Sequence, residues 1–443
     1  MTCHSAFSKT EKRFFIAVAC FVLLLLGAIG WLYYRDLDPH VTLPTVTLPN
    51  PNAHDYFAKA SDIAQQSMNN TMKKPSFNML FKCTRPTLRH GMPTFSTPLN
   101  PQHPEVTWET VNALTAQMVP ATAQLHQGFA MAYQVPPQPS MYQDFISYLS
   151  LAMLLSVNGN ARAHAGDWGG ATDYYLDAVQ FGAKVEGHNS MMVAKNVQDD
   201  GRMNAMLISR QLSAAQARTA TRRMEAIIAQ IPSEREVLLA EKDQRLRCLL
   251  DMLHKPGWRK GIFPSHGGLF SPQMQVSFYT KRDIVNHLVR FMDAQIASTQ
   301  QPYTTRKAEV LTNPHDLQIR DEMDTSLGYT PFMYHCNATF NALLLASYAL
   351  QAYHQEKRTY PASLAELVPG YLHAIPNDPF AANKPLCYKR TGADFLLYSI
   401  GPDGKDDGGV TSNSGAAGAK PGDFERMLSN ASRGDIVAGV DLR

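Results

Sequence analysis

The pattern of hydrophobic and polar residues divides the chain into three parts: one unbroken apolar run, a long region with helical periodicity and a short β-type end. The unbroken run, FFIAVACFVLLLLGAIGWLYY at 14–34, carries no charge. With a rise of about 1.5 Å per residue, a helix of this length crosses a hydrocarbon core of about 30 Å. The run therefore predicts a transmembrane helix.

Residues on either side of this run predict its orientation. Basic residues precede it and aromatic residues close it, at Lys9, Lys12, Arg13, Trp31, Tyr33 and Tyr34. Because Lys and Arg are retained on the cytoplasmic side, residues 1–13 are expected in the cytoplasm and the chain beyond Arg35 outside it, on the periplasmic side in a bacterium. A cleaved signal peptide is the alternative, but its apolar run usually spans about 7 to 15 residues and ends in an A-x-A-like site. The run here is longer and AIG before Trp31 matches that site poorly, so an uncleaved anchor is favoured.

A linker and then a long helical region follow the anchor. Residues 35–51 carry four prolines and no helical period, which is typical of an extended linker. From the capping residue Asn52 onward, apolar positions recur with a helical period as far as residue 330. Helices are expected within 52–68, 105–118, 142–185, 189–212, 214–231, 233–254 and 280–298, with loops over 73–104 and 256–273.

The segment 142–185 is expected to form two antiparallel helices that turn at Gly166-Asp167-Trp168. It resembles one tetratricopeptide-like hairpin. Solenoids of such hairpins need about three repeats, and the chain shows one, so an irregular helical bundle is favoured. The adjacent Asp199 and Asp200 in VQDDGR are interpreted as a cap or turn at a helix break.

Near residue 330 the pattern changes. A long amphipathic helix is expected over 333–360, followed by two short β-type runs, PLCYKR and DFLLYSI, that Thr391-Gly392-Ala393 joins as a hairpin. The predicted fold class is mainly α, with an N-terminal transmembrane helix, an extracytoplasmic helical bundle and a small C-terminal α+β head. The predicted units are a cytoplasmic tail, an anchor, a linker, a helical domain and the head, at 1–13, 14–34, 35–51, 52–330 and 331–443.

From about Thr339 to its end, the chain resembles the globular head of the major pseudopilins of type II secretion. The resemblance is carried by a helix, YPASLAELVPGYL, IPNDPF, the hairpin, LYSIGPDGKDDGG and a late GDI at 434–436, in that order. In that family the acidic loop after the second strand binds a calcium ion that stabilises the head. The resemblance implies calcium ligands at Asp403, Asp406, Asp407 and Asp435, and calcium prefers carboxylate and carbonyl oxygens in flexible loops.

The acidic loop has one open alternative, which is a solvated turn without a metal. An EF-hand is excluded because Lys405 and Ser414 occupy positions that need acidic or amide ligands. A P-loop is excluded because no G-K-[ST] follows and the aspartates would repel phosphate. The family's processing motif is also absent, since KTEKRFFIAV has no glycine before Phe14 and no Glu within the apolar run.

Composition limits the possible partners. A hydrophobic content of 44% indicates a real core, and a formal net charge of +3 is too small to indicate a nucleic-acid partner. The cysteines beyond the anchor, which are Cys83, Cys248, Cys336 and Cys387, either form one or two disulfides or remain buried thiols.

No catalytic motif of the H-E-x-x-H, G-x-S-x-G or G-x-G-x-x-G type occurs. The sequence therefore favours a non-enzymatic, membrane-anchored envelope protein that binds or scaffolds a protein partner. The alternatives are an envelope enzyme with its site in the helical region, or an accessory component of a type II secretion or pilus-like system.

Overall fold

The computed structural model describes residues 9–71, 77–89, 92–95, 106–137, 144–187, 191–258, 280–306, 329–382, 384–411 and 433–439. Within them the chain is mainly helical with a small antiparallel sheet, which confirms the predicted fold class at that level. Most of the loop predicted at 256–273 and most of the segment after Gly409 lie outside these ranges.

The helices are α1 (Lys9–Asp36), α2 (Ala53–Thr71), α3 (Phe77–Thr84), α4 (Trp108–Gln117), α5 (Val119–Phe129), α6 (Phe145–His164), α7 (Trp168–Val185), α8 (Met191–Ile208), α9 (Ala214–Ile228), α10 (Glu234–His254), α13 (Lys281–Ser298) and α15 (Thr330–Lys357). Most helices lie within or close to the predicted ranges, whereas α3 and α5 were not predicted. Short 3-10 turns are η1 (Ser209–Gln211), η2 (Tyr303–Thr305) and η4 (Leu364–Leu367). The strands are β1 (Thr87–Arg89), β2 (Met92–Thr94), β3 (Cys387–Thr391), β4 (Asp394–Ser399) and β5 (Ile436–Val437).

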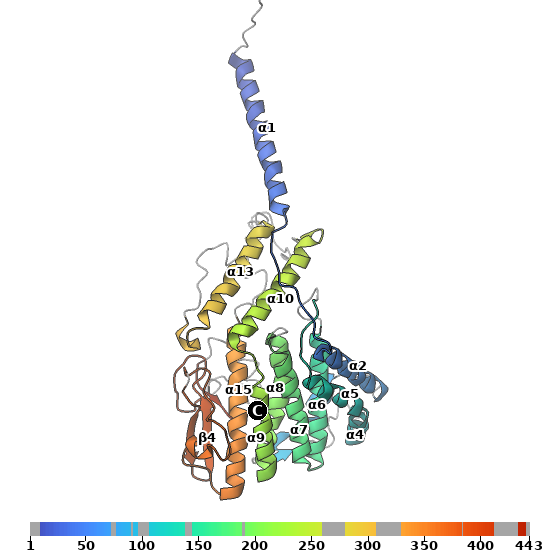
Figure 1. Cartoon of the computed structure of the whole chain (residues 1–443), viewed down its shortest axis with the longest axis vertical. Helices are drawn as coiled ribbons and strands as arrows, with labels where there is room; N and C mark the ends of the chain where they lie inside the picture. The colour runs from blue at the N-terminus through green and yellow to red at the C-terminus, as the bar shows by residue number, and fades with distance from the viewer. Residues whose placement is uncertain are drawn as a thin grey trace, which may run out of the picture.

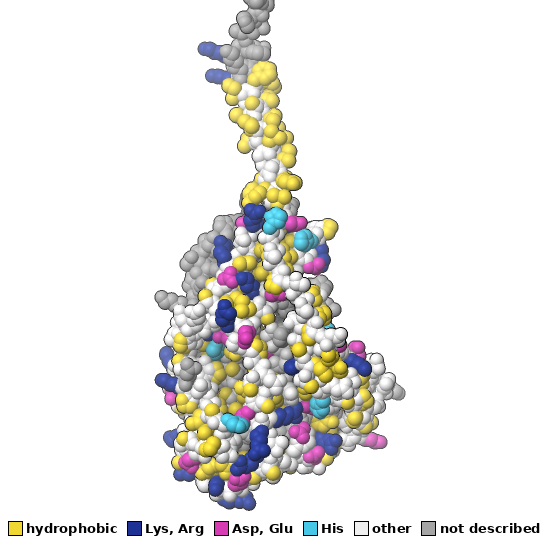
Figure 2. Space-filling model, viewed as in Figure 1, with side chains coloured by type: hydrophobic (Ala, Val, Ile, Leu, Met, Phe, Trp, Pro, Cys, Tyr) yellow, Lys and Arg dark blue, Asp and Glu magenta, His cyan; other side chains and the backbone are white. Residues whose placement is uncertain are grey.

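Helix α1 extends alone from the rest of the molecule (Figure 1). Its segment Arg13–Tyr34 is long and apolar enough to cross a membrane, and none of its hydrophobic window is buried. Hydrophobic side chains cover this helix along its visible length (Figure 2). After α1 the linker is extended, and its Val41 and Leu43 pack against the small core that α10 and α13 share.

The predicted helix pair at 142–185 is confirmed as α6 and α7, which turn at Gly166. Close packing continues from α7 to α8, because a Cβ atom at Gly201 would lie only 2.5 Å from the carbonyl oxygen of Tyr175. Gly201 lies in the middle of α8, which runs without interruption from Met191 to Ile208. The prediction of a helix break at Asp199 and Asp200 is wrong, since both residues lie inside α8.

The prediction of a loop over 73–104 is wrong in part. Helix α3 and the hairpin of β1 and β2 lie within this range. Thr87 and Thr94 pair across the hairpin, and their hydroxyl groups lie 3.2 Å apart. The strands are only three residues long, which is too short for a period-2 pattern to stand out among prolines and threonines.

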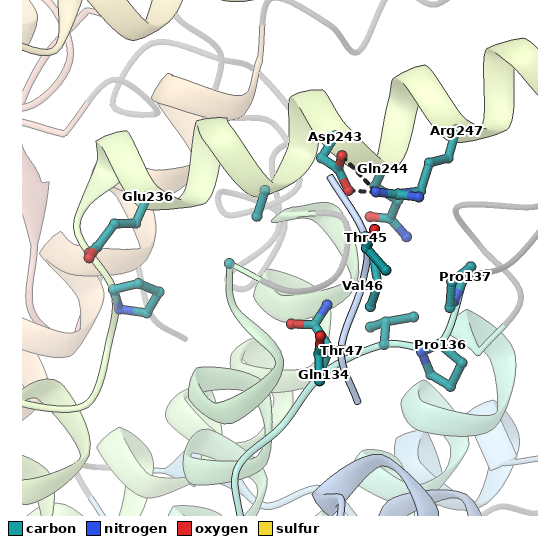
Figure 3. A pocket seen from close by; sticks show the side chains of 14 residues that line it. Thr45, Val46, Thr47, Gln134, Pro136, Pro137, Glu236, Asp243, Gln244 and Arg247 are labelled. Carbon is teal, nitrogen blue, oxygen red and sulfur yellow. Dashed lines mark hydrogen bonds and ion pairs between the residues drawn. The ribbon is translucent and has the colours of Figure 1, made fainter. Parts of the chain in front are cut away.

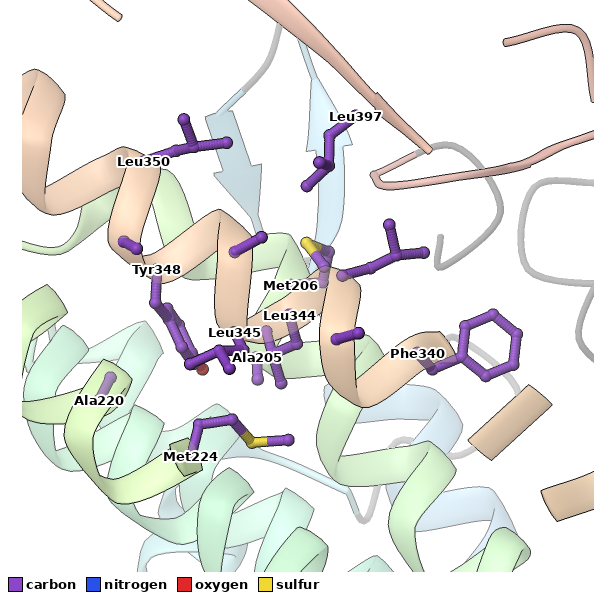
Figure 4. Packing of buried hydrophobic residues seen from close by; sticks show 14 of the residues in the cluster. Ala205, Met206, Ala220, Met224, Phe340, Leu344, Leu345, Tyr348, Leu350 and Leu397 are labelled. Atoms are coloured by element: carbon purple, nitrogen blue, oxygen red, sulfur yellow. The ribbon is translucent and has the colours of Figure 1, made fainter. Parts of the chain in front are cut away.

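Helix α15 lies at the centre of the largest hydrophobic core. Its apolar side chains pack with residues of α8 and α9, such as Met206 and Met224, and with Leu397 of β4 (Figure 4). Phe340, Leu344 and Tyr348 are fully buried there, as their helical spacing predicts. The same core contains Leu397 of β4 and Ile436 of β5 together with residues of α8 and α9. Residues before and after the division predicted at 330 therefore share one core.

The C-terminal sheet has three strands in the order β3-β4-β5 and is antiparallel throughout. The predicted hairpin is confirmed, but Thr391 belongs to β3 and pairs with Asp394, so the turn is Gly392 and Ala393 and is one residue shorter than predicted. Gly392 has a φ of 65°, a left-handed conformation that glycine adopts without steric cost. The late GDI leads into β5, which begins at Ile436 and adds to the edge of β4.

A buried polar network joins α7, α8 and α15. The side chain of Arg202 on α8 is 0% exposed, and its guanidinium donates to Asp199 and to the side chain and carbonyl of Asn337 on α15. It also donates to the amide oxygen of Asn341 at 3.3 Å. A guanidinium in a protein interior needs such partners, because losing water is costly for a charge. The network therefore fixes the register of α15 against α8.

The carboxylate of Glu186, at the end of α7, extends this network. Its Oε2 accepts hydrogen bonds from Gln198 at 2.9 Å and Asn337 at 2.7 Å. Burial raises the pKa of Glu186 to about 7, although these hydrogen bonds and the charge of Arg202 oppose the shift. The network thus contains a carboxyl group that titrates near neutral pH.

Replacing Arg202 by Met tests the network. Removing one partner of a buried ion pair leaves other polar groups unsatisfied, so we expect a loss of about 3–5 kcal/mol in the free energy of urea unfolding. Arg162→Met is the control, because Arg162 and Asp167 form a half-exposed pair whose loss should cost less than about 1 kcal/mol. Equal losses in the two variants would contradict the structural role given to Arg202.

Glu186→Gln tests the buried carboxyl group. Because the folded pKa exceeds the unfolded one, the folded state holds a proton that the unfolded state releases between pH 4.5 and about 7. Glu186 should therefore reduce the stability of the wild type by about 3 kcal/mol as pH rises through this range. We expect the variant to lose less stability over this range than the wild type and Glu109→Gln, an exposed control. Identical pH profiles for all three proteins would contradict the assignment.

Candidate functional site

The acidic loop predicted to bind calcium follows β4 directly. Asp435 is fully buried, and its two carboxylate oxygens accept the backbone N–H groups of Asp407 at 3.2 Å and Gly409 at 2.6 Å. Asp406 accepts the hydroxyl of Tyr398 and the N–H of Gly408, both at 2.9 Å. Hydrogen bonds from the backbone of the loop to one buried carboxylate thus hold the loop against β5.

The four predicted ligands are only partly brought together. Burial raises the pKa of Asp435, and the negative charges of Asp406 and Asp407 raise it further, so these three carboxylates are close enough to interact. Asp403 instead accepts the N–H of Lys405 at 3.1 Å within its own turn. In the part of the chain that the structure describes, no three His, Cys, Asp or Glu side chains form a group that could hold a metal ion.

The close approach of the loop to β5 depends on Gly401. This residue has a φ of 72°, and a Cβ atom there would lie 2.4 Å from the carbonyl oxygen of Gly434. No other residue type fits this contact without displacing the backbone. Gly401 is therefore required for the packing of the chain, whether or not the loop binds a ligand.

A further buried carboxylate, Asp378 in IPNDPF, escaped the sequence analysis. It accepts the hydroxyl of Ser399 at 2.7 Å and the N–H groups of Phe380 at 2.9 Å and Ile400 at 2.8 Å. Burial raises its pKa, and these hydrogen bonds oppose the shift. Asp378 joins the segment before β3 to the end of β4, which gives this part of the resembling motif a structural role.

The most apolar cavity described lies between α9, α15 and the segment 373–379, and its volume is about 700 Å³. Small side chains open the space between the two helices. They are Ala226, Ala229, Ala338 and Ala342. Leu345, Ile228 and Ile375 complete the apolar wall. Concave, mainly apolar cavities of this size between helices are common ligand sites.

Few polar side chains border this cavity. Glu225 accepts the N–H of His373 at 2.9 Å and contacts its ring nitrogen at 2.6 Å, which fixes the 373–379 wall to α9. Tyr334 donates its hydroxyl to the carbonyl of Pro232. Asn341 belongs to the Arg202 network and donates to Gln198 at 3.2 Å, so the cavity borders that network.

A second cavity, of about 510 Å³, lies where the linker crosses α10. Thr45, Val46 and Thr47 form one side of it and Pro136 and Pro137 another (Figure 3). On α10, Arg247 pairs with Asp243 and also donates to the carbonyl of Pro44. The polar groups of this cavity thus hold the linker in place.

The cysteines of the helical region and head form no disulfide with one another. Cys83, Cys248 and Cys336 are buried, and Cys387 is half-buried on β3. Burial raises the pKa of the Cys248 and Cys387 thiols. The alternative of buried thiols is therefore the one that the structure contains.

No family model, curated protein or solved structure matches this chain. The likeness to pseudopilin heads consequently rests on the sequence motifs alone. The function has to be derived from the cavities, charges and hydrogen bonds of the chain itself.

Proposed function

We propose that the protein is a membrane-anchored binding protein without a catalytic role, and that the cavity between α9 and α15 is its binding site. The carrying observation is the apolar lining of this cavity, formed by alanines of both helices together with Leu345 and Ile375. Apolar walls favour binding through removal of ligand surface from water, at about 25 cal/mol per Å².

The polar groups of the cavity favour binding over catalysis. An acid–base or nucleophilic mechanism needs converging groups whose reactive atoms point toward a bound substrate. Among the residues described around the cavity, the side chain of His373 that bonds to Glu225 is 87% exposed to solvent, and Asn341 is committed to the buried network. These groups shape the walls of the site.

We place the cavity outside the cytoplasm. Basic residues before the apolar segment of α1, including Lys9 and Arg13, favour retention of that end in the cytoplasm. The linker is held to the helical region near this anchor, since Lys281 on α13 bonds to Asp38 at 2.6 Å. An uncleaved α1 would thereby tether the helical region to one membrane surface, with α10 and α13 next to the anchor (Figure 1).

We also propose that the C-terminal head is pseudopilin-like and that its acidic loop binds calcium. Support comes from the ordered motifs and from the negative charges of Asp406 and Asp407 beside the buried carboxylate of Asp435. A divalent cation would offset this repulsion, and Asp403 would supply a further carboxylate.

Filling the cavity tests the binding function. The full chain in phosphatidylcholine nanodiscs would be dialysed against 4-phenylbutan-1-ol, a neutral apolar probe. We expect Ala338→Trp to weaken binding at least about tenfold, equivalent to 1.4 kcal/mol, because the indole occupies the cavity. Ala215→Trp, an exposed site on α9 outside the cavity, should bind as the wild type does. If the wild type retains no more probe than Ala338→Trp, the cavity is not a binding site.

Calcium binding is tested by calorimetry of the full chain with 1 mM calcium or a chelator. A ligand present at about 100 times its dissociation constant stabilises the folded state by about 2.7 kcal/mol. We expect calcium to raise the melting temperature of the wild type and of Asp62→Asn, an exposed control on α2, but not of Asp403→Asn. An unchanged melting temperature in the wild type would leave the acidic stretch as a solvated turn.

A further inference from the structure

The arginines of α9 differ in how their charge is used. Arg218 bonds to both carboxylate oxygens of Glu356, at 2.7 Å and 2.9 Å. Arg223 bonds to Asp177 at 2.5 Å. Arg222 borders the cavity, is exposed, and has no ion-pair partner among the residues that the structure describes. It is therefore the uncommitted positive charge at the mouth of this cavity.

The acidic group at the same mouth is already engaged. Glu225 accepts two contacts from His373, one from its N–H and one from its ring. These hydrogen bonds direct the carboxylate toward the 373–379 wall. Its charge is thereby partly offset by His373, whereas the guanidinium of Arg222 remains available to an anion.

The wall that α15 contributes to the cavity offers apolar surface and little hydrogen bonding. Ala338 and Ala342 line it from α15, and the amide of Asn341 already bonds to Arg202 and Gln198. An apolar group buried here gains from loss of its water contact, whereas a polar group would lose hydrogen bonds to water without replacement.

We propose that this cavity binds a small amphipathic carboxylate, with its apolar body between α9 and α15 and its carboxylate on Arg222. This inference rests on the proposed binding function and names its ligand class. A volume of about 700 Å³ suits a small molecule with an aryl or short alkyl body. The guanidinium provides a planar pair of donors that matches a carboxylate.

Three probes with the same apolar body test the charge preference. The full chain in phosphatidylcholine nanodiscs would be dialysed against 4-phenylbutyrate, 4-phenylbutan-1-ol and 4-phenylbutylamine, and Ala338→Trp would correct for partition into lipid. We expect the carboxylate to bind about 3- to 10-fold more tightly than the alcohol, and the amine more weakly than both, given one charge-assisted contact at an exposed site.

Arg222→Gln should abolish the preference for the carboxylate over the alcohol. Arg235→Gln removes the same charge from an exposed position on α10 outside the cavity, so it should retain the preference. Equal binding of carboxylate and alcohol to the wild type, or equal loss of preference in both variants, would overturn the ligand class while leaving the cavity as a binding site. Failure of every probe to bind above Ala338→Trp would overturn the binding function and this inference together.

Discussion

The buried positive charge of Arg202 is the constraint on which the arrangement of the helices depends. A guanidinium without water must be surrounded by acceptors, and here they come from α8 itself and from α15, which follows more than a hundred residues later. Apolar packing alone would tolerate small shifts of one helix along another. The hydrogen bonds from the two terminal nitrogens of Arg202 to Asp199, Asn337 and Asn341 require one register of α15 against α8, so the network adds specificity to the core.

This register determines the geometry of the two features with functional potential. One face of α15 bonds to the Arg202 network, an adjacent face lines the apolar cavity with α9, and the opposite side packs on the sheet of the head. The cavity and the head are therefore positioned by the same helix. A ligand between α9 and α15 would contact residues next to the network, and Asn341 belongs to both.

Much of this architecture could be predicted from local sequence. The apolar run of α1, the α6–α7 pair and the hairpin at Gly392 each carry their signal within a few dozen residues. The β1–β2 hairpin escaped prediction because its strands are too short to show a period. The continuity of α8 through Asp199 and Asp200 also escaped prediction. Asp199 is compensated inside the helix by Lys195 and Arg202, and Arg202 in turn bonds to Asn337 on the distant α15, which no local pattern shows.

The candidate site was less accessible to sequence reasoning. The cavity requires α9, α15 and the segment 373–379 to meet, and no local pattern encodes distances between elements so far apart. The acidic loop was located correctly as a motif, and Asp435 does lie beside it. Asp435 accepts the N–H groups of Asp407 and Gly409 because β5 pairs with β4, and only the tertiary structure reveals this pairing.

The central claim is that the helical region and the head form one unit through α15 and its buried network. Hydrogen exchange of the full chain at increasing denaturant, read by mass spectrometry, tests this most directly. If the claim holds, the amides of α8 and of β4 lose their protection together, with the same free energy of opening. Loss of protection in β4 at a clearly lower denaturant concentration than in α8 would show that the head opens by itself, and would contradict the account.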